Sequence, residues 1–521
     1  EAMEISKGKF IFDESETANS IIPEPPADSS MPPDYFPPEN ADDIQDELEP
    51  QKEDGRHHGK SHSPTWWSED YKQAKQFFYG DEDAGITQDY EKAYSLLLLE
   101  AELNNPLAMY DIGRMNADGL GCSEDADKSH QRYEKALTVF HAAESENPWK
   151  YTQYRIGKMY AAGLGTEQDY MKAAQWLTQS ASEKYKYAEY SLAGLYYRGN
   201  GVEQDYQTAF ELYLRSAKQG FPYASFEAGK MFRDGIGCDK NEAKAEKYFT
   251  DAFHGFNSLE KQSHDDKLQY RLGCMLLNGM GTEKDILQAR SYFEKAALVG
   301  NSFAAYQLGK LYLGGEGILK DISEALRWFN IAAQQRNQFA EYALGCLYLK
   351  GEDVPKDVAK AISHLKGAAI NGNEFAEYRL GKIYLAGEDV LKNVEIALQY
   401  LAASAKQGNQ YAQYTLGKLY LMGKDIPRDK EEAVKWFTLS AAQGNIYAQF
   451  FLDHIDEFKE PSVMLAATRL LHHMSRIIGD TAPARIPPNQ RADRKLLQKI
   501  RAKKQAQGHK QDDHEQSMHT L

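Results

Sequence analysis

A 36-residue unit recurs along most of the chain and constrains its fold more than any other feature. It is clearest from Phe303 to Gly317, where an Ala-x-Tyr-x-x-Gly-x-x-Tyr frame ends in a Gly-x-Gly turn. The small residue at the centre of the frame recurs at nine positions: Gly113, Gly157, Ala193, Gly229, Gly273, Gly309, Gly345, Gly381 and Gly417. The steps between these positions are 36 residues, except for two of 44. Self-similarity at such a period indicates a stacked-repeat protein.

Each unit has the pattern of two helices. In the first, Ala, aromatic and Gly positions recur three and four apart, which is helical periodicity, and a second Gly six residues after the centre suits a left-handed helix end. The second helix is predicted to begin at an Asp or Asn whose side chain accepts a backbone N–H. These predicted caps are Asp89, Asp169, Asp205, Asn241, Asp285, Asp321, Asp357, Asn393 and Asp429. The two 44-residue steps predict eight-residue insertions after a second helix, near 138–150 and 252–266.

The combined pattern, AxYxLGxLYxxGxG followed by DxxxAxxWFxxAAxxGN, resembles the Sel1-like repeat, a relative of the tetratricopeptide repeat. The resemblance covers about residues 66–458. It implies an all-α fold, an α/α superhelical solenoid of about ten two-helix repeats, and the composition outside the repeats predicts disordered N- and C-terminal arms. It also implies a protein that binds other proteins and has no chemistry of its own.

The segments outside the repeats differ in composition. Residues 1–65 are predicted to be a disordered, proline-rich acidic arm, since residues 13–54 hold fourteen Asp and Glu against one Lys. Residues 459–480 have an amphipathic pattern, which indicates a helix that caps the open solenoid end or, alternatively, docks a partner. Residues 481–521 are predicted to be a linker and a basic tail.

A ladder of aromatic and basic residues runs along the first helices. Its first rung, the residue before the frame Ala, is aromatic in most repeats, and its third rung, seven residues later, is usually Lys. Two interpretations remain open: a concave groove for an extended acidic peptide, or aromatic packing between repeats covered by lysine stems. The predicted partner-binding residues are Tyr187, Tyr223, Phe303, Phe339, Phe375, Tyr411, Lys158, Lys230, Lys310, Lys382 and Lys418; Tyr151, Tyr447 and Arg114 extend the same pattern.

The basic tail suggests a second kind of contact. Residues 489–510 are rich in Lys and Arg, so they are predicted to contact nucleic-acid phosphates without sequence preference, unless they form only a solvated tail. The predicted contacts are Arg491, Arg494, Lys495, Lys499, Arg501, Lys503 and Lys504. The stretch from Leu470 onward also resembles the C-terminal end of Sel1-repeat-bearing relaxases of Gram-positive conjugative elements. That resemblance implies a bacterial, accessory-protein-binding region whose catalytic domain would precede residue 1, and it leaves an enzyme fragment as an alternative.

Motifs of catalysis and cofactor binding are not recognisable in the sequence. It has no nucleophile elbow, HExxH, Walker loop or dinucleotide fingerprint, so no enzymatic activity, cofactor or metal is predicted. Cys274 and Cys346 lie two repeats apart, and Cys122 and Cys238 three apart, which argues against a disulfide framework and favours reduced thiols and a cytoplasmic location. No stretch approaches the ~20 apolar residues of a membrane span. The sequence therefore predicts a non-enzymatic interaction scaffold, with a DNA-associated module as the alternative.

Overall fold

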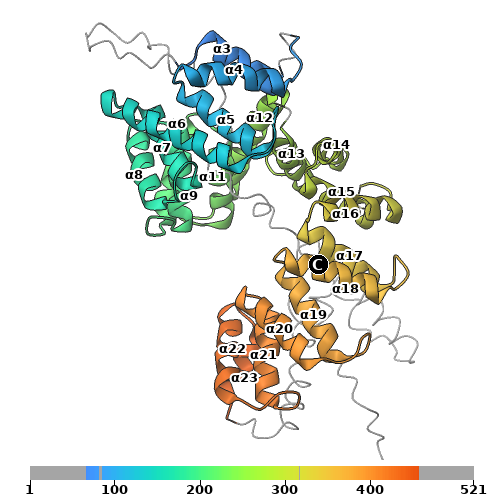
Figure 1. Cartoon of the computed structure of the whole chain (residues 1–521). Coiled ribbons are helices and arrows are strands. Elements are labelled where there is room, and N and C mark those ends of the chain that lie inside the picture. The colour runs from blue at the N-terminus through green and yellow to red at the C-terminus, as the bar shows by residue number, and fades with distance from the viewer. Residues whose placement is uncertain (1–65, 81–84, 264, 316, 457–521) are drawn as a thin grey trace, which may run out of the picture. The chain divides into compact units, whose positions relative to one another are not determined.

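The computed structural model describes residues 66–80, 85–263, 265–315 and 317–456, and within these ranges every regular element is an α-helix (Figure 1). The acidic arm, the predicted capping helix 459–480 and the basic tail lie outside the described residues. The described chain divides into two compact units, residues 66–320 and 321–456. Ten helix pairs and one further helix form an α/α solenoid, as the sequence predicts.

The unit formed by residues 66–320 holds the first thirteen of these helices. Odd-numbered labels mark first helices and even-numbered labels mark second helices of the repeats. The bounds are α3 (Glu69–Tyr79), α4 (Tyr90–Glu102), α5 (Pro106–Asp118), α6 (Ala126–Glu146), α7 (Lys150–Ala162), α8 (Tyr170–Ser182), α9 (Lys186–Arg198), α10 (Tyr206–Lys218), α11 (Pro222–Asp234), α12 (Glu242–Ser263), α13 (Asp266–Asn278), α14 (Ile286–Leu298) and α15 (Ser302–Gly314).

The unit formed by residues 321–456 continues the same alternation. Its helices are α16 (Ile322–Gln334), α17 (Gln338–Lys350), α18 (Val358–Ile370), α19 (Glu374–Ala386), α20 (Val394–Lys406), α21 (Gln410–Met422), α22 (Lys430–Ala442) and α23 (Ile446–Asp453). The helix α23 follows the last helix pair, and α3 and α4 form a pair that precedes the first of the nine recurrent small residues, Gly113.

Local hydrogen bonding sets the helix ends where the sequence places them. Each first helix from α5 to α21 ends at the predicted Gly in the left-handed conformation, with φ between 63° at Gly423 and 71° at Gly199. The predicted caps also accept backbone donors; Asp357 Oδ1, for example, lies 3.0 Å from the Lys360 nitrogen. The sequence analysis missed one cap, Asp125, which begins α6 in the same way.

The two 44-residue steps differ from the prediction. Instead of separate insertions, the extra residues lengthen the second helices: α6 has 21 residues and α12 has 22, where the other second helices have 13. The added turns contribute the fully buried Phe140 and Phe256. Burial of these rings stabilises a continued helix over a loop.

The central glycines lie where first and second helices cross. A Cβ added at Gly381 would stand 2.6 Å from Leu401 Cγ and 3.2 Å from the carbonyl oxygen of Ala397. Gly345 meets Leu365 in the same way, at 2.7 Å. These glycines therefore permit a helix approach that a side chain would obstruct.

The cysteines and the apolar helices bear on two further expectations from the sequence. All four cysteines lie in the described residues, and none forms a disulfide. Within the same residues, no helix combines the length and the apolar character that a bilayer span requires.

Candidate functional site

Within each of the two units, the predicted ladder residues lie on one side of the first helices, and we call this side the ladder face of that unit. Its first rung is Tyr151, Tyr187, Tyr223, Phe303, Phe339, Phe375, Tyr411 and Tyr447, and its third rung is Lys158, Lys230, Lys310, Lys382 and Lys418. In residues 66–320 the exposed fractions of Tyr151, Tyr187 and Tyr223 are only 3%, 1% and 4%. The first-rung rings from Phe303 onward are half-buried. The ladder face therefore changes character along the chain, from buried rings to partly exposed ones.

First-rung rings pack against the frame Tyr of the preceding repeat. In residues 66–320 the ring centroids lie 5.9 Å apart for Tyr154 and Tyr187 and 6.3 Å apart for Tyr190 and Tyr223. In residues 321–456 the pairs are Tyr342–Phe375 at 6.5 Å, Tyr378–Tyr411 at 6.1 Å and Tyr414–Tyr447 at 6.2 Å. Such tilted and edge contacts suit aromatic pairs. The rings thus join neighbouring repeats, and the half-buried ones also keep part of their surface on the ladder face.

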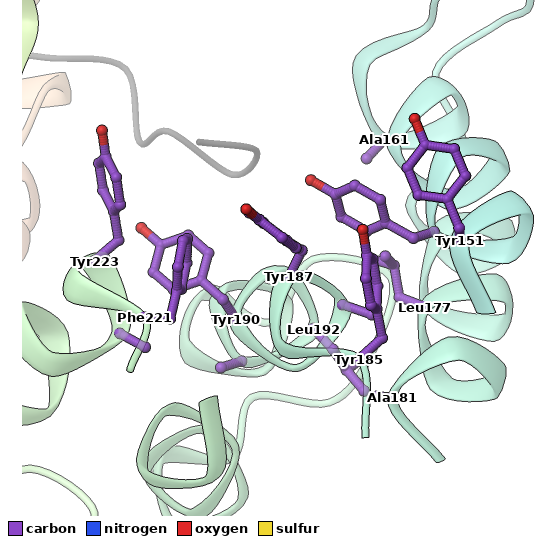
Figure 2. Close-up of a cluster of buried hydrophobic side chains, with 14 of the residues drawn as sticks. Tyr151, Ala161, Leu177, Ala181, Tyr185, Tyr187, Tyr190, Leu192, Phe221 and Tyr223 are labelled. Atoms are coloured by element: carbon purple, nitrogen blue, oxygen red, sulfur yellow. The ribbon is translucent and has the colours of Figure 1, made fainter. Parts of the chain in front are cut away.

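Three further aromatic residues add to these ring contacts between repeats in residues 66–320. Trp149, Tyr185 and Phe221 stand at the N-cap positions of α7, α9 and α11 and make no side-chain cap bond. The later first helices α15 to α23 have a capping Asn there instead. Tyr185 packs 5.4 Å from Tyr187, and Figure 2 shows these two rings in one cluster with Phe221 and Tyr223. The sequence signal was the loss of the closing Asn in these three repeats.

The start of the described chain is fixed on the same face. Trp67 packs against Trp149 and Tyr151, with centroid distances of 6.0 and 5.1 Å. Trp66 packs 5.4 Å from Phe140, and its carbonyl oxygen accepts from Asn105 Nδ2 at 2.7 Å. Sequence analysis did not predict this anchor, because its partners lie more than 35 residues away.

The third-rung lysines are half-buried, with their ammonium groups near aromatic rings. The Nζ atoms of Lys158, Lys310 and Lys418 lie 5.8 to 6.0 Å from the ring centroid of the Tyr one turn earlier in the same helix. Lys230 lies 6.0 Å from Phe226, and Lys382 is also half-buried. At these distances the rings attract the cations, and the aliphatic stems cover apolar surface.

Three arginines on the second rung, four residues after the first, complete the ladder face and were missed by sequence analysis. Arg155 Cζ lies 4.2 Å from the ring centroid of Tyr110. Arg271 Cζ lies 5.3 Å from that of Tyr223. Arg379 Nε donates to the Tyr342 hydroxyl at 3.2 Å. Each arginine thus sits on a ring of the preceding repeat. The signal was in the sequence, because these arginines lie four residues after the first-rung positions and so share their helix face.

Acidic residues on the ladder face of residues 66–320 are paired with lysines. Asp111 Oδ2 accepts from Lys75 Nζ at 3.0 Å, and Glu227 Oε2 accepts from Lys230 Nζ at 2.9 Å. Burial, with Arg271 and Arg233 nearby, lowers the pKa of Lys230 to about 7. Arg155, Lys158, Arg271 and Lys310 add four cations to this face. The ladder face is therefore basic, although the whole chain has a formal net charge of −16.

The ladder face combines aromatic rings with cationic side chains. Among the residues that the structure describes, no group of three or more His, Cys, Asp or Glu is placed to hold a metal ion. The recurring pairs of rings and cations instead form a repeated surface suited to carboxylates and apolar side chains. The predicted nucleic-acid contacts, from Arg491 to Lys504, lie outside the described residues.

Comparisons with known proteins agree with the repeat architecture. The Sel1 repeat family matches ten stretches of the chain: residues 74–105, 106–137, 151–185, 186–221, 222–252, 267–301, 302–337, 338–373, 375–409 and 410–445. No curated protein matches the chain significantly.

Solved structures of two repeat proteins are similar to the chain. The first is c5321, a protective antigen present in uropathogenic Escherichia coli strains displaying an SLR fold, with 25% identity, a TM-score of 0.33 and coverage of 81% of this chain and 96% of that chain. The second is a Sel1 repeat protein from Oxalobacter formigenes, with 28% identity, a TM-score of 0.40 and coverage of 48% and 96%.

Proposed function

Since the chain belongs to the Sel1 repeat family, we propose that it is a non-enzymatic scaffold that binds an extended, acidic segment of a partner protein along its ladder face. Sel1-repeat solenoids are generally protein-interaction modules and typically non-catalytic. The ligand of this scaffold is therefore another polypeptide, which is bound but not chemically altered. The residues that would bind the partner are thus also residues that pack between neighbouring repeats.

The single observation that supports this proposal is the recurrence of partly exposed rings beside half-buried cations. In residues 321–456, Phe375 and Tyr411 lie on the same face as Arg379, Lys382 and Lys418. Packed helices lie about 8–10 Å apart, and an extended chain advances about 3.3 Å per residue. One repeat therefore corresponds to about three residues of an extended ligand. A segment with a carboxylate at every third residue would meet about one cation per repeat.

The test uses a fluorescein-labelled synthetic peptide with Glu at every third residue and Tyr and Pro between. Its affinity for the full chain is measured by fluorescence anisotropy. Replacing Lys382 and Lys418 by Gln should weaken binding about two- to thirtyfold, because each exposed ion pair contributes roughly 0.2–1 kcal/mol. Raising the salt concentration should reduce this difference, since salt screens exposed charges.

The matched control replaces Lys366 and Lys406, which are exposed on the second helices α18 and α20. This control removes the same charge without touching the ladder face. Equal loss of affinity in both double variants would show that only net charge matters, and the proposed site would then be wrong. Phe375→Leu gives an independent test, since an aromatic anchor should weaken binding when truncated while circular dichroism shows an intact fold.

A second proposal concerns the basic tail. Its composition supports non-specific contact with DNA, and its resemblance to relaxase C-terminal ends supports a role in conjugative transfer. A chain ending at residue 488 should lose DNA affinity in a gel-shift assay and keep its affinity for the acidic peptide. Undiminished DNA binding by the shortened chain would contradict the role of the tail.

A further inference from the structure

We infer that the chain's own acidic arm, residues 13–54, binds in cis to the ladder face of residues 66–320. The arm would occupy that part of the face and leave the ladder face of residues 321–456 for a partner. This inference rests on the proposed function, because it assumes that the ladder face accepts extended acidic segments. Beyond that function, it names the arm as the ligand of one part of the ladder face, and it restricts a partner to the other part. In residues 66–320 the contacts would be made by the cations of that face, since Tyr151, Tyr187 and Tyr223 are buried.

The folded chain begins beside the ladder face, at the point where the arm joins it. Trp66 and Trp67 are held against Trp149 and Tyr151, and Asn105 and Ser68 add hydrogen bonds at 2.7 and 2.6 Å to this junction. Tyr151 is a first-rung residue of the ladder face. The arm is therefore tethered at the ladder face itself, and its residue 54 lies only twelve residues before Trp66.

The arm is long enough to follow the ladder face of residues 66–320. The ladder face runs over the five first helices α7, α9, α11, α13 and α15, and their side chains contact from one repeat to the next. At about 8–10 Å between packed helices, this stretch measures roughly 40 Å. A polypeptide of 42 residues can span up to about 140 Å. The arm is therefore more than long enough to follow the ladder face from its tethered end.

The arm is also complementary to the ladder face in charge and composition. The arm has 14 acidic residues among 42, or one in three, and a single Lys. That frequency matches the spacing of about three extended residues per repeat. The arm also has Tyr35 and Phe36 between paired prolines, and proline favours the extended backbone that such a site accepts. Tethering adds an effective concentration in the millimolar range, so even weak contacts would be populated.

The experiment measures lysine acetylation by mass spectrometry on two full-length chains. One is the natural sequence, and the other has every Asp and Glu of residues 13–54 replaced by Asn or Gln. Lys158 and Lys310 report on the ladder face of residues 66–320. Lys135 and Lys295, exposed on the second helices α6 and α14, are the controls. Circular dichroism should be the same for both chains, because the substitutions lie outside the repeats.

At low salt, Lys158 and Lys310 should be acetylated at least threefold more slowly in the natural chain than in the neutralised one. The control lysines should react equally in both chains, and 0.5 M NaCl should remove the contrast because the contacts are charged. Equal rates at Lys158 and Lys310 in the two chains at low salt would overturn the inference.

Adding the acidic probe peptide separates this inference from the proposed function. The peptide should protect Lys382 and Lys418 in both chains, and Lys158 and Lys310 additionally in the neutralised chain. If the peptide protects Lys382 and Lys418 in neither chain, the proposed partner site is wrong. The difference in the acetylation rates of Lys158 and Lys310 between the two chains still tests whether the arm binds. If the peptide protects Lys158 and Lys310 equally in both chains, the arm is not their occupant.

Discussion

Replacement of Gly381 by Ala tests whether the recurrent central glycine is required by packing. The Gly381 position lies in the middle of α19, where an added Cβ would stand 2.6 Å from Leu401 Cγ and 2.9 Å from Leu401 Cδ2. It would also stand 3.2 Å from the carbonyl oxygen of Ala397. Neither contact can be relieved by moving only the far end of a flexible side chain, because one partner is backbone and Leu401 is fully buried.

The expected magnitude follows from two opposing terms. Ala is favoured over Gly within a helix by roughly 0.5–1 kcal/mol. Overpacking a filled site costs roughly 1–3 kcal/mol. Gly314 supplies the reference, since it is exposed at the end of α15 and a Cβ there meets nothing within 4 Å. Because the helix term is at most as large at the end of α15 as in the middle of α19, the difference between the two substitutions gives a lower bound on the overpacking cost of about 1–3 kcal/mol.

The assay is urea unfolding followed by circular dichroism at 222 nm, with thermal melts as a second measurement. Gly314→Ala should leave the free energy of unfolding unchanged or raise it slightly, and Gly381→Ala should lower it. Gly381→Leu should lower it further, since more atoms must be accommodated. The reasoning is refuted if Gly381→Ala is as stable as Gly314→Ala, because the close helix contact would then carry no steric requirement.

Three further predictions concern caps, burial and pH. Asp357→Ala should lower the free energy of unfolding by about 1 kcal/mol in urea titrations, whereas Asp357→Asn should not, because Asn still accepts from the Lys360 nitrogen; equal losses would contradict a capping role. Tyr187→Ala should cost about 3–5 kcal/mol in thermal melts and Phe375→Ala clearly less, because Tyr187 is fully buried and Phe375 is not; equal costs would contradict the change in burial. The pKa of Lys230 is lowered to about 7 by burial and by Arg271 and Arg233, so between about pH 7 and 10.5 the unfolded chain binds a proton that the folded chain lacks. Stability should therefore rise with pH in this window more steeply for the natural chain than for Lys230→Met; identical slopes in urea midpoints at pH 7, 8 and 9 would contradict the lowered pKa.

Local features of the sequence are sufficient to predict the repeat architecture. The helix centres, the left-handed glycines and the Asp and Asn caps depend on interactions within a few residues, and each recurs at a fixed spacing. Repetition makes these weak local signals reliable, because a pattern seen nine times is not accidental. The number of repeats and the two-helix unit were therefore predicted correctly.

Long-range contacts account for what the sequence did not show. The extra residues before Trp149 extend α6 instead of forming an insertion, because Phe140 packs against Trp66, which lies 74 residues earlier. Arg155 rests on Tyr110 of the preceding repeat, and such a pairing is invisible until the repeats are stacked. Sequence spacing gave the helix face of these residues but not their neighbours.

The ladder face shows most clearly which features the sequence determines and which depend on the packed structure. Its periodicity, read from the sequence alone, placed aromatic and basic residues on one face of the first helices. Whether each ring is buried depends on the residues that the neighbouring repeats bring to it. Trp149, Tyr185 and Phe221 add rings beside Tyr151, Tyr187 and Tyr223, while capping asparagines replace them in the later repeats. Periodicity fixes the direction of a side chain, but burial is a property of the packed neighbours, and only the tertiary structure decides it.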